Sequence, residues 1–144
     1  MKKISFKIES KTTLVDLLSK AVKAACSMEF LSEVDLYNIE LSITESVMNV
    51  IKHAYHMDPE QIIELTTIIE GEYITFELQD SGDFKPLPDP KDKEIYTKQS
   101  INRLPESGMG LMIIRQVMEQ VELDRKEGKN HLMMRMRKAQ VNYA

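Results

Sequence analysis

Apolar and polar residues follow two different periodicities near the start of the chain. Over residues 4–8 they alternate, which predicts a strand with one buried face. Over residues 14–25 the apolar residues recur every three or four positions, which predicts an amphipathic helix. Thr12 or Thr13 is expected to cap that helix, because a threonine oxygen can accept a hydrogen bond from an unpaired backbone N–H.

A longer helix is predicted from Ser32 to the break at Pro59. Its apolar residues form one buried stripe, made of Leu36, Ile39, Ile43, Val47, Val50 and Ala54. Glu45, Asn49 and His53 stand at four-residue steps, and at about 100° per residue the first two lie nearly opposite Val47. This polar row is either the solvated side of a surface helix or a surface that faces a polar ligand.

The second half of the chain predicts two hairpins, separated by a long segment and a helix. Strands are expected over 62–70 and 73–79, joined by a two-residue turn that contains glycine. The proline-bearing segment that follows is poor in apolar residues and longer than a usual connection, which is typical of a functional loop. Helical spacing then runs from Met109 to Val121, and residues 121–138 predict a hairpin with a turn at "EGKN".

This order of elements predicts an α+β fold in two layers. Helices that pack on one face of a sheet give a two-layer sandwich, and the hairpins make the sheet mainly antiparallel. We expect a mixed, mainly antiparallel sheet of about five strands with three helices on one face. A chain of 144 residues fits a single domain, residues 1–144.

Composition excludes several classes of protein. A net charge of −4 argues against a nucleic-acid partner, since such proteins present basic surfaces. No run of about 18 apolar residues is present, so a membrane span is not expected, and the alternating N-terminus lacks the continuous apolar run of a signal peptide. Cys26 is the sole cysteine, which rules out an internal disulfide. A cytoplasmic location fits these features best.

Three motifs carry the candidate chemistry. The first is the helical row with Glu45, Asn49 and Lys52; the second is "DSG", Asp80 to Gly82, at the end of a predicted strand. The third is "SGMGL", Ser107 to Leu111, where glycines at a helix start let backbone N–H groups approach phosphate. Each motif alone is commonly surface decoration, a turn or a steric choice at a helix start.

In this order and spacing the motifs resemble the nucleotide-binding boxes of the GHKL (Bergerat-fold) ATPase and kinase superfamily. The closer resemblance is to its small stand-alone branch, the anti-sigma factor serine/threonine kinases of bacteria, in which the long helix ends in a triplet similar to His53-Ala54-Tyr55. The resemblance covers nearly the whole chain. A histidine kinase of the superfamily needs a further helical domain with a phosphoacceptor histidine, for which this chain has no room.

The resemblance implies ATP and Mg²⁺ as cofactors. Asn49 is expected to ligate Mg²⁺ through its side-chain oxygen, and Lys52 is expected near the phosphates. Glu45, one helical turn before Asn49, is expected to be the catalytic base that takes the proton from a serine or threonine hydroxyl.

The other two motifs are expected to hold the rest of the nucleotide. Asp80 would accept a hydrogen bond from the adenine amino group, and Gly82 would let the backbone pass close to the base. Backbone donors to the phosphates would come from the glycine motif, namely Ser107, Gly108, Met109 and Gly110. Residues 83–106 would form the lid over ATP.

The resemblance implies a protein serine/threonine kinase that phosphorylates a small STAS-type anti-anti-sigma partner. A sigma factor, which the protein would sequester, and a second copy of the chain are further partners that it leaves open. The alternative is a nucleotide-gated binding switch that binds ATP without transferring phosphate. Glu45 favours the kinase, whereas Glu106, which stands where the branch commonly has an arginine, favours the switch. A scaffold domain that binds no ATP is the third possibility.

Overall fold

A computed structural model describes residues 1–29, 31–89 and 106–138, and over residues 106–109 it describes the backbone alone. Along the chain the elements are β1 (Lys2–Glu9), a 3-10 turn η1 (Thr12–Leu14), α1 (Val15–Cys26), α2 (Glu33–Asn49), a π-helical turn η2 (Val50–Ala54), β2 (Ile62–Glu70), β3 (Tyr73–Asp80), α4 (Glu106–Val117), β4 (Gln120–Lys126) and β5 (Lys129–Arg137).

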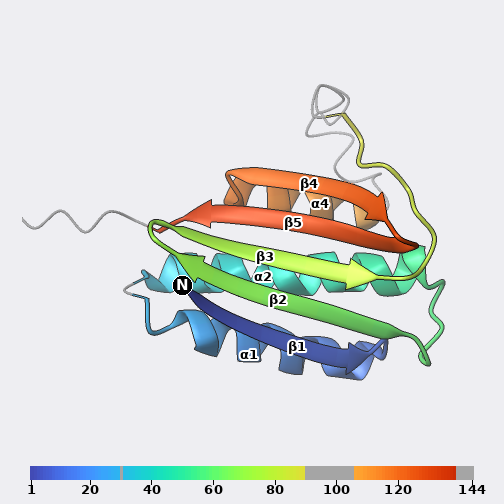
Figure 1. Ribbon diagram of the computed structural model, residues 1–144, viewed down its shortest axis with the longest axis horizontal. Coiled ribbons are helices and arrows are strands. Elements are labelled where there is room, and N and C mark those ends of the chain that lie inside the picture. Colours follow the sequence, from blue (N-terminus) through green and yellow to red (C-terminus); the bar gives the residue numbers. More distant parts are fainter. Residues whose placement is uncertain (30, 90–105, 139–144) are drawn as a thin grey trace, which may run out of the picture.

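The strands form one sheet in the order β1-β2-β3-β5-β4, and every neighbouring pair is antiparallel. In the part of the chain that the structure describes, α1, α2 and α4 lie on the same side of this sheet, with α2 behind its centre and α1 and α4 at its two ends (Figure 1). The structure confirms the predicted two-layer α+β fold. Within the described residues the sheet is antiparallel throughout rather than mixed. The pairs β2–β3 and β4–β5 are hairpins, and the pairs β1–β2 and β3–β5 are antiparallel as well.

The core lies between the sheet and the helices. Every second residue of β2 and β3 points toward the helices and is buried, as the period of two requires. The helices contribute matching apolar stripes, so α2 buries Ile39, Ile43 and Val47 completely. The predicted stripe of the long helix is therefore confirmed at its centre.

The helix starts show one correct and one wrong prediction. The Ser32 side chain accepts a hydrogen bond from the Asp35 backbone N–H at 3.1 Å and caps α2, as expected. Thr12 and Thr13 do not cap α1, because they lie inside the 3-10 turn, and the N-cap position falls to Leu14 without a side-chain bond.

The last helix is shorter than predicted. After Val117 the Met118 N–H still donates to the Ile114 carbonyl, but the next N–H, from Glu119, donates to Arg135 of β5. The chain thereby leaves the helix for the sheet, and Val121 lies in β4 rather than in the helix. The spacing of apolar residues did not reveal where the helix ends, because Val121 fits the helical spacing although it lies in the strand.

Both hairpins turn where the sequence predicted. Gly71 has φ +58°, and the second turn has two consecutive positive values, +55° at Glu127 and +75° at Gly128. Two positive φ angles are those of the type I′ turn, whose twist matches that of the flanking strands. This tight turn sets Arg125 of β4 opposite Asn130 of β5.

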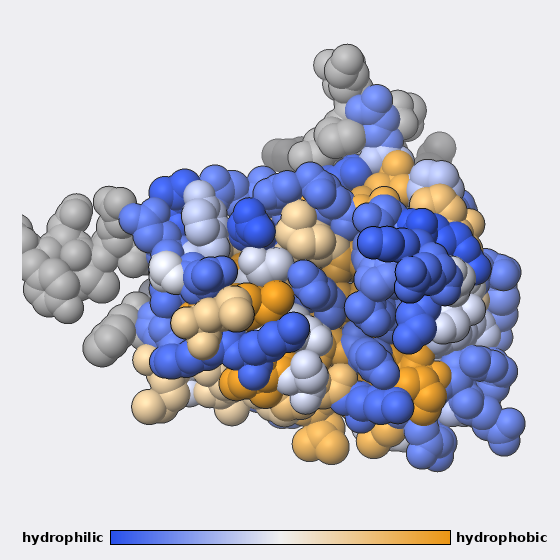
Figure 2. Space-filling model, viewed as in Figure 1, coloured by the Kyte–Doolittle hydropathy of each residue, from blue (hydrophilic) through white to orange (hydrophobic). Residues whose placement is uncertain are grey.

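The face of the sheet away from the helices is open. Figure 2 shows that this face is mostly hydrophilic, with scattered apolar residues. Arg135 and Arg137 lie on it and stack near the Tyr73 ring, at 5.4 and 5.0 Å from its centre. Among the described residues, no helix combines the length and apolar character that crossing a membrane would require.

Candidate functional site

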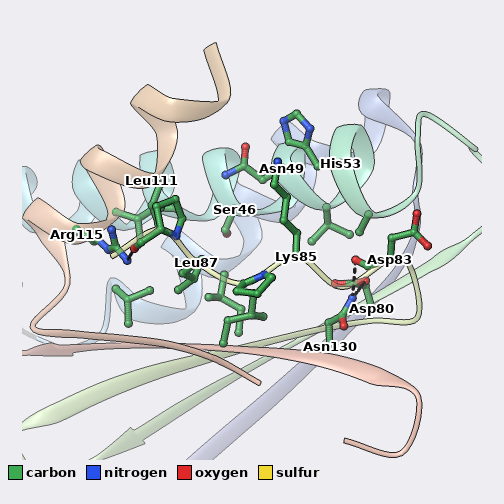
Figure 3. A pocket seen from close by; sticks show the side chains of 18 of the residues that line it. Ser46, Asn49, His53, Asp80, Asp83, Lys85, Leu87, Leu111, Arg115 and Asn130 are labelled. Carbon is green, nitrogen blue, oxygen red and sulfur yellow. Dashed lines mark hydrogen bonds between the residues drawn. The ribbon is translucent and has the colours of Figure 1, made fainter. Parts of the chain in front are cut away.

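A pocket of about 240 Å³ opens between the helix layer and one end of the sheet (Figure 3). Its walls come from α2 and η2, the end of β3 with the segment 83–89, and α4, β4 and β5. Polar side chains on these walls include Asn49, His53, Asp80, Asp83, Arg115 and Asn130. Apolar side chains from α4 and the last hairpin, such as Leu111, Leu123 and Leu132, line the remainder.

The fold brings two of the sequence-predicted residues to this pocket from separate motifs. Asn49 enters from the last turn of α2, and Asp80 enters from the last residue of β3 (Figure 3). The helix presents Asn49 because the opposite side of α2 is buried in the core. One wall therefore offers a neutral amide and the other a carboxylate.

Glu45 faces α4 rather than the pocket. A Cβ added to Gly110 would lie 2.6 Å from Glu45 Oε2, so the carboxylate rests directly on the helix backbone there. Glu45 is not among the residues that line the pocket, and a side chain at position 110 would displace it. The first and third motifs are thus in contact.

Asp80 is the most constrained group of the site. It is 7% exposed, and its Oδ1 accepts hydrogen bonds from the Gly82 backbone N–H at 2.9 Å and from Asn130 Nδ2 at 2.8 Å. Burial raises the pKa of the Asp80 carboxyl above its ordinary value, and the Gly82 amide, Asn130 and then the Arg125 charge oppose that rise. The site therefore holds a desolvated carboxylate with defined donors, a common feature of binding sites.

Gly82 lies against the end of the long helix. A Cβ at this position would meet the Ala54 carbonyl oxygen at 2.4 Å and the Ala54 Cβ at 2.8 Å. The next N–H, from Asp83, donates to the same carbonyl at 3.0 Å. Only glycine permits this approach, which places the second motif directly on the triplet that ends the helix.

Tyr55 completes that contact. Its hydroxyl donates to the Ile62 carbonyl at 2.6 Å and accepts from the Ser81 N–H at 2.8 Å. The ring is 6% exposed and is carried by the π turn, in which the Tyr55 N–H donates to Val50 five residues earlier. Widened turns of this kind occur often at functional sites. Ala54 and Tyr55 of the triplet thus position the Asp-Ser-Gly motif.

The remaining predicted residues have mixed outcomes. Lys52 is partly buried on η2 and is not part of the pocket lining. Ser107, Gly108 and Met109 belong to the first turn of α4, but their side chains lie outside the described residues. The roles given to all these residues stay predictions.

The predicted lid, 83–106, is described only in part. Its first residues, 83–89, line the pocket, and Arg115 Nη2 of α4 donates to the Pro88 carbonyl at 2.6 Å. Residues 90–105 lie outside the described residues.

Sequence reasoning missed Asn130 and Arg125. The sequence places Asn130 in the "EGKN" turn, whereas the turn is only Glu127-Gly128 and Asn130 belongs to β5, opposite Arg125 of β4. Nothing in the sequence indicates that β5 pairs with β3, which is the pairing that sets Asn130 opposite Asp80.

The donor set fits a nucleotide-borne magnesium ion better than a protein-built metal site. Within the described residues, no group of three or more histidine, cysteine, aspartate or glutamate side chains could hold a metal ion. Magnesium commonly takes one or two protein oxygens and completes its shell with water and phosphate oxygens. The Asn49 amide oxygen is a suitable single ligand of this kind.

Comparison with known sequences is consistent with this site. The sequence profile of the histidine kinase-like ATPase domain matches residues 8–136. The serine-protein kinase RsbW of Bacillus cereus (strain B4264) is 27% identical over 137 residues, which cover 91% of this chain and 82% of that protein. The protein of the same name from Bacillus thuringiensis (strain Al Hakam) is 25% identical over 134 residues, with the same shares covered.

Solved structures of similar fold include the RsbU and RsbW domains of a Mycobacterium tuberculosis protein, with a TM-score of 0.67 at 12% identity. This likeness covers 96% of the present chain and 33% of that larger one. The SiaB–SiaC complex from Pseudomonas aeruginosa matches with a TM-score of 0.63 at 12% identity, covering 92% of this chain and 88% of the other. At such identities the likeness shows the fold.

Proposed function

This chain belongs to the histidine kinase-like ATPase domain family, and we propose that it binds ATP with Mg²⁺ and phosphorylates a protein serine or threonine. The acceptor is a small STAS-type anti-anti-sigma protein, and the chain acts as an anti-sigma factor kinase in the cytoplasm. Relatives named serine-protein kinase RsbW support this assignment.

The observation that carries the proposal is the convergence of three separate motifs at one pocket. Asn49 and Asp80 line it from opposite walls, Leu111 of the third motif lines it as well, and Glu45 packs against Gly110 outside the lining. A base bound at Asp80 and phosphates bound near α4 would span the pocket between them. The positive end of α4 favours the negative phosphates.

The chain's own residues have distinct roles in this proposal. Asp80 accepts the adenine amino hydrogen bond, and Gly82 keeps the backbone close to the base. Asn49 holds Mg²⁺, which when bound neutralises phosphate charge and orients the γ-phosphoryl group. Glu45 would accept the hydroxyl proton of the partner's serine or threonine as the hydroxyl oxygen attacks the γ-phosphorus, and the bond to the bridging oxygen would break to release ADP.

A nucleotide-gated binding switch is the second candidate, because Glu45 rests on the Gly110 backbone instead of lining the pocket. In that case ATP would change the α2–α4 contact and thereby the affinity for a protein partner. A sigma factor or a second copy of the chain would then be a partner of the nucleotide-bound form.

One experiment separates the two functions. The purified chain is incubated with Mg·ATP and a co-expressed candidate STAS protein, and intact-mass spectrometry follows the partner for a gain of one phosphate. Phosphate on a serine or threonine supports the kinase. Nucleotide-dependent complex formation without any phosphate gain supports the switch, and the absence of ATP binding in calorimetry would refute both.

A further inference from the structure

We propose that Asn130, supported by Arg125, determines which purine edge the site accepts, by holding the Asp80 carboxylate in one orientation. The inference rests on the proposed nucleotide site and deepens it, since it concerns residues outside the three motifs. Asn130 and Arg125 act here as positioning residues.

The three residues form a row across three strands. Asp80 is the cross-strand partner of Asn130 in the β3–β5 pair, and Arg125 is the partner of Asn130 in the β5–β4 pair. The register of two antiparallel pairs therefore brings them together at one end of the sheet. Figure 3 shows Asn130 and Asp80 joined at the floor of the pocket.

Asn130 and the Gly82 amide occupy one oxygen of the carboxylate. Oδ1 of Asp80 accepts from Asn130 Nδ2 at 2.8 Å and from the Gly82 N–H at 2.9 Å. Among the described residues, no donor contacts Oδ2, while Asp80 itself lines the pocket. The carboxylate thus offers a ligand one oxygen, and an ionised oxygen can only accept a hydrogen bond.

Arg125 determines which way the Asn130 amide faces. Arg125 Nη1 donates to Asn130 Oδ1 at 2.8 Å and to the Gly82 carbonyl at 3.0 Å. A guanidinium group has only donors, so it selects the amide oxygen and turns the amide nitrogen toward Asp80. Asn130 is 3% exposed, and its nitrogen also lies 3.2 Å from the Gly82 and Asp83 carbonyls, so the opposite amide orientation would lose all of these bonds.

The consequence is selectivity for a 6-amino purine. An adenine amino group can donate to the free oxygen, whereas a 6-oxo purine would set its carbonyl oxygen against a carboxylate. A site built to pair a ligand N–H strongly rejects an analogue that lacks it. Without Asn130 the carboxylate loses a donor that fixes its rotation, and this selectivity should fall.

The first test compares ATP with purine riboside triphosphate, which lacks only the amino group, by titration calorimetry in the presence of Mg²⁺. Asn130→Ala should weaken ATP about tenfold, the effect of one hydrogen bond, and should weaken the desamino nucleotide less than about twofold. Asn38→Ala, on α2, is the matched control and should change neither. A loss of equal size for both nucleotides would mean a merely structural role and would overturn the inference.

The second test does not depend on the folding of an Asn130 variant. In Asp80→Asn the new amide oxygen should accept the two existing hydrogen bonds, which leaves its amide nitrogen facing the pocket. Inosine triphosphate, a 6-oxo purine nucleotide, should then bind more tightly than ATP, which reverses the parental order. An unchanged order of affinities would show that Asn130 and Gly82 do not orient this group.

Arg125→Leu provides a third variant at an exposed position, and it should reduce the ratio of ATP to desamino affinity by about two- to fivefold if Arg125 sets the Asn130 amide. A parent protein that binds ATP with a selectivity unaffected by any of these variants would overturn this inference alone. A parent that binds no nucleotide would overturn the proposed function as well.

Discussion

The two ends of the pocket are built differently. At the base end, Asn130 donates to Asp80, Arg125 donates to the Gly82 carbonyl, and the Ser81 N–H donates to the Tyr55 hydroxyl. At the phosphate end, within the described residues, no hydrogen bond joins the side chain of Glu45 or Asn49 to α4, and the contact there is close packing on Gly110. Hydrogen bonds therefore order the base end, whereas the described contact at the other end is packing of Glu45 on Gly110. Binding and chemistry should therefore respond to different mutations.

The largest expected effect tests the phosphate end. Glu45→Gln keeps the size of the side chain but lacks the basicity, so phosphate transfer should slow by about 10²- to 10⁴-fold. Its affinity for Mg·ATP and for the partner should stay near that of the parent. Single-turnover phosphorylation and calorimetry measure the two quantities.

Asn49→Ala is the comparison for that variant, since it should weaken Mg·ATP binding together with transfer. If Glu45→Gln transferred phosphate at the parental rate, Glu45 would not be the base.

The second prediction breaks the base end. Gly82→Ala forces a Cβ to within 2.4 Å of the Ala54 carbonyl oxygen, so either the long helix or the strand end must move. We expect a loss of about 2–4 kcal/mol in unfolding free energy, comparable to severe overpacking, together with a large loss of ATP affinity. Denaturant unfolding and calorimetry measure both losses.

Gly71→Ala is the matched control, because its Cβ would meet no atom within 4 Å and only the φ of +58° is strained. It should cost about 1 kcal/mol in stability and leave ATP affinity unchanged. Equal effects of the two variants on ATP affinity would disprove the close-approach argument.

The third prediction concerns Tyr55, whose hydroxyl joins the Ile62 carbonyl to the Ser81 N–H next to the base end. Tyr55→Phe removes a hydroxyl that satisfies the Ile62 carbonyl and the Ser81 N–H. Buried backbone groups left without partners cost about 1–3 kcal/mol, so unfolding free energy should fall by that amount and ATP should bind a few-fold more weakly. Tyr37→Phe, at a residue that is 60% exposed, should have no measurable effect on either quantity.

The smallest expected effect is a pH dependence of stability that arises from Asp80 at the base end. Burial raises the pKa of the Asp80 carboxyl above its ordinary value of 3.8, so at neutral pH the ionised group opposes folding of the free protein. Stability linked to Asp80 should therefore rise as the pH falls through its folded-state pKa. Asp80→Asn should stabilise the free protein at pH 7, and its advantage should shrink toward pH 4.

Thermal unfolding at several pH values tests this prediction, with Asp124→Asn on the open sheet face as the control. A destabilised Asp80→Asn protein at pH 7 would show that the carboxylate contributes net stability to the fold.

The sequence predicted most of the fold because local rhythm determined it. Alternation placed the hairpins, the stripe around Ile43 placed α2, and Ser32 fixed its start. The failures also have local causes: Val121 continued a helical rhythm inside a strand, and the π turn over Val50–Ala54 has no signal that separates it from an α-helix.

The site was predictable only as far as the family resemblance reached. The resemblance implied that Asn49 and Asp80 bind the same nucleotide, and in the structure both residues line one pocket. Asn130 could not be found in this way, because its role depends on the pairing of β5 with β3 across about fifty residues of sequence. The position of Glu45 against Gly110 likewise depends on how two helices pack.

The row of Asp80, Asn130 and Arg125 has a consequence for how the chain folds while it is being synthesised. Asn130 follows Asp80 by 50 residues, and it belongs to β5, which lies between β3 and β4 in the sheet. A nascent chain that has already paired β1, β2 and β3 still lacks β5, the strand that carries Asn130. Because domains fold as units during translation, the nucleotide selectivity proposed for this row would arise only when the final hairpin leaves the ribosome. ATP in the cell would then act as a late ligand that captures the finished fold, rather than as a template on which it assembles.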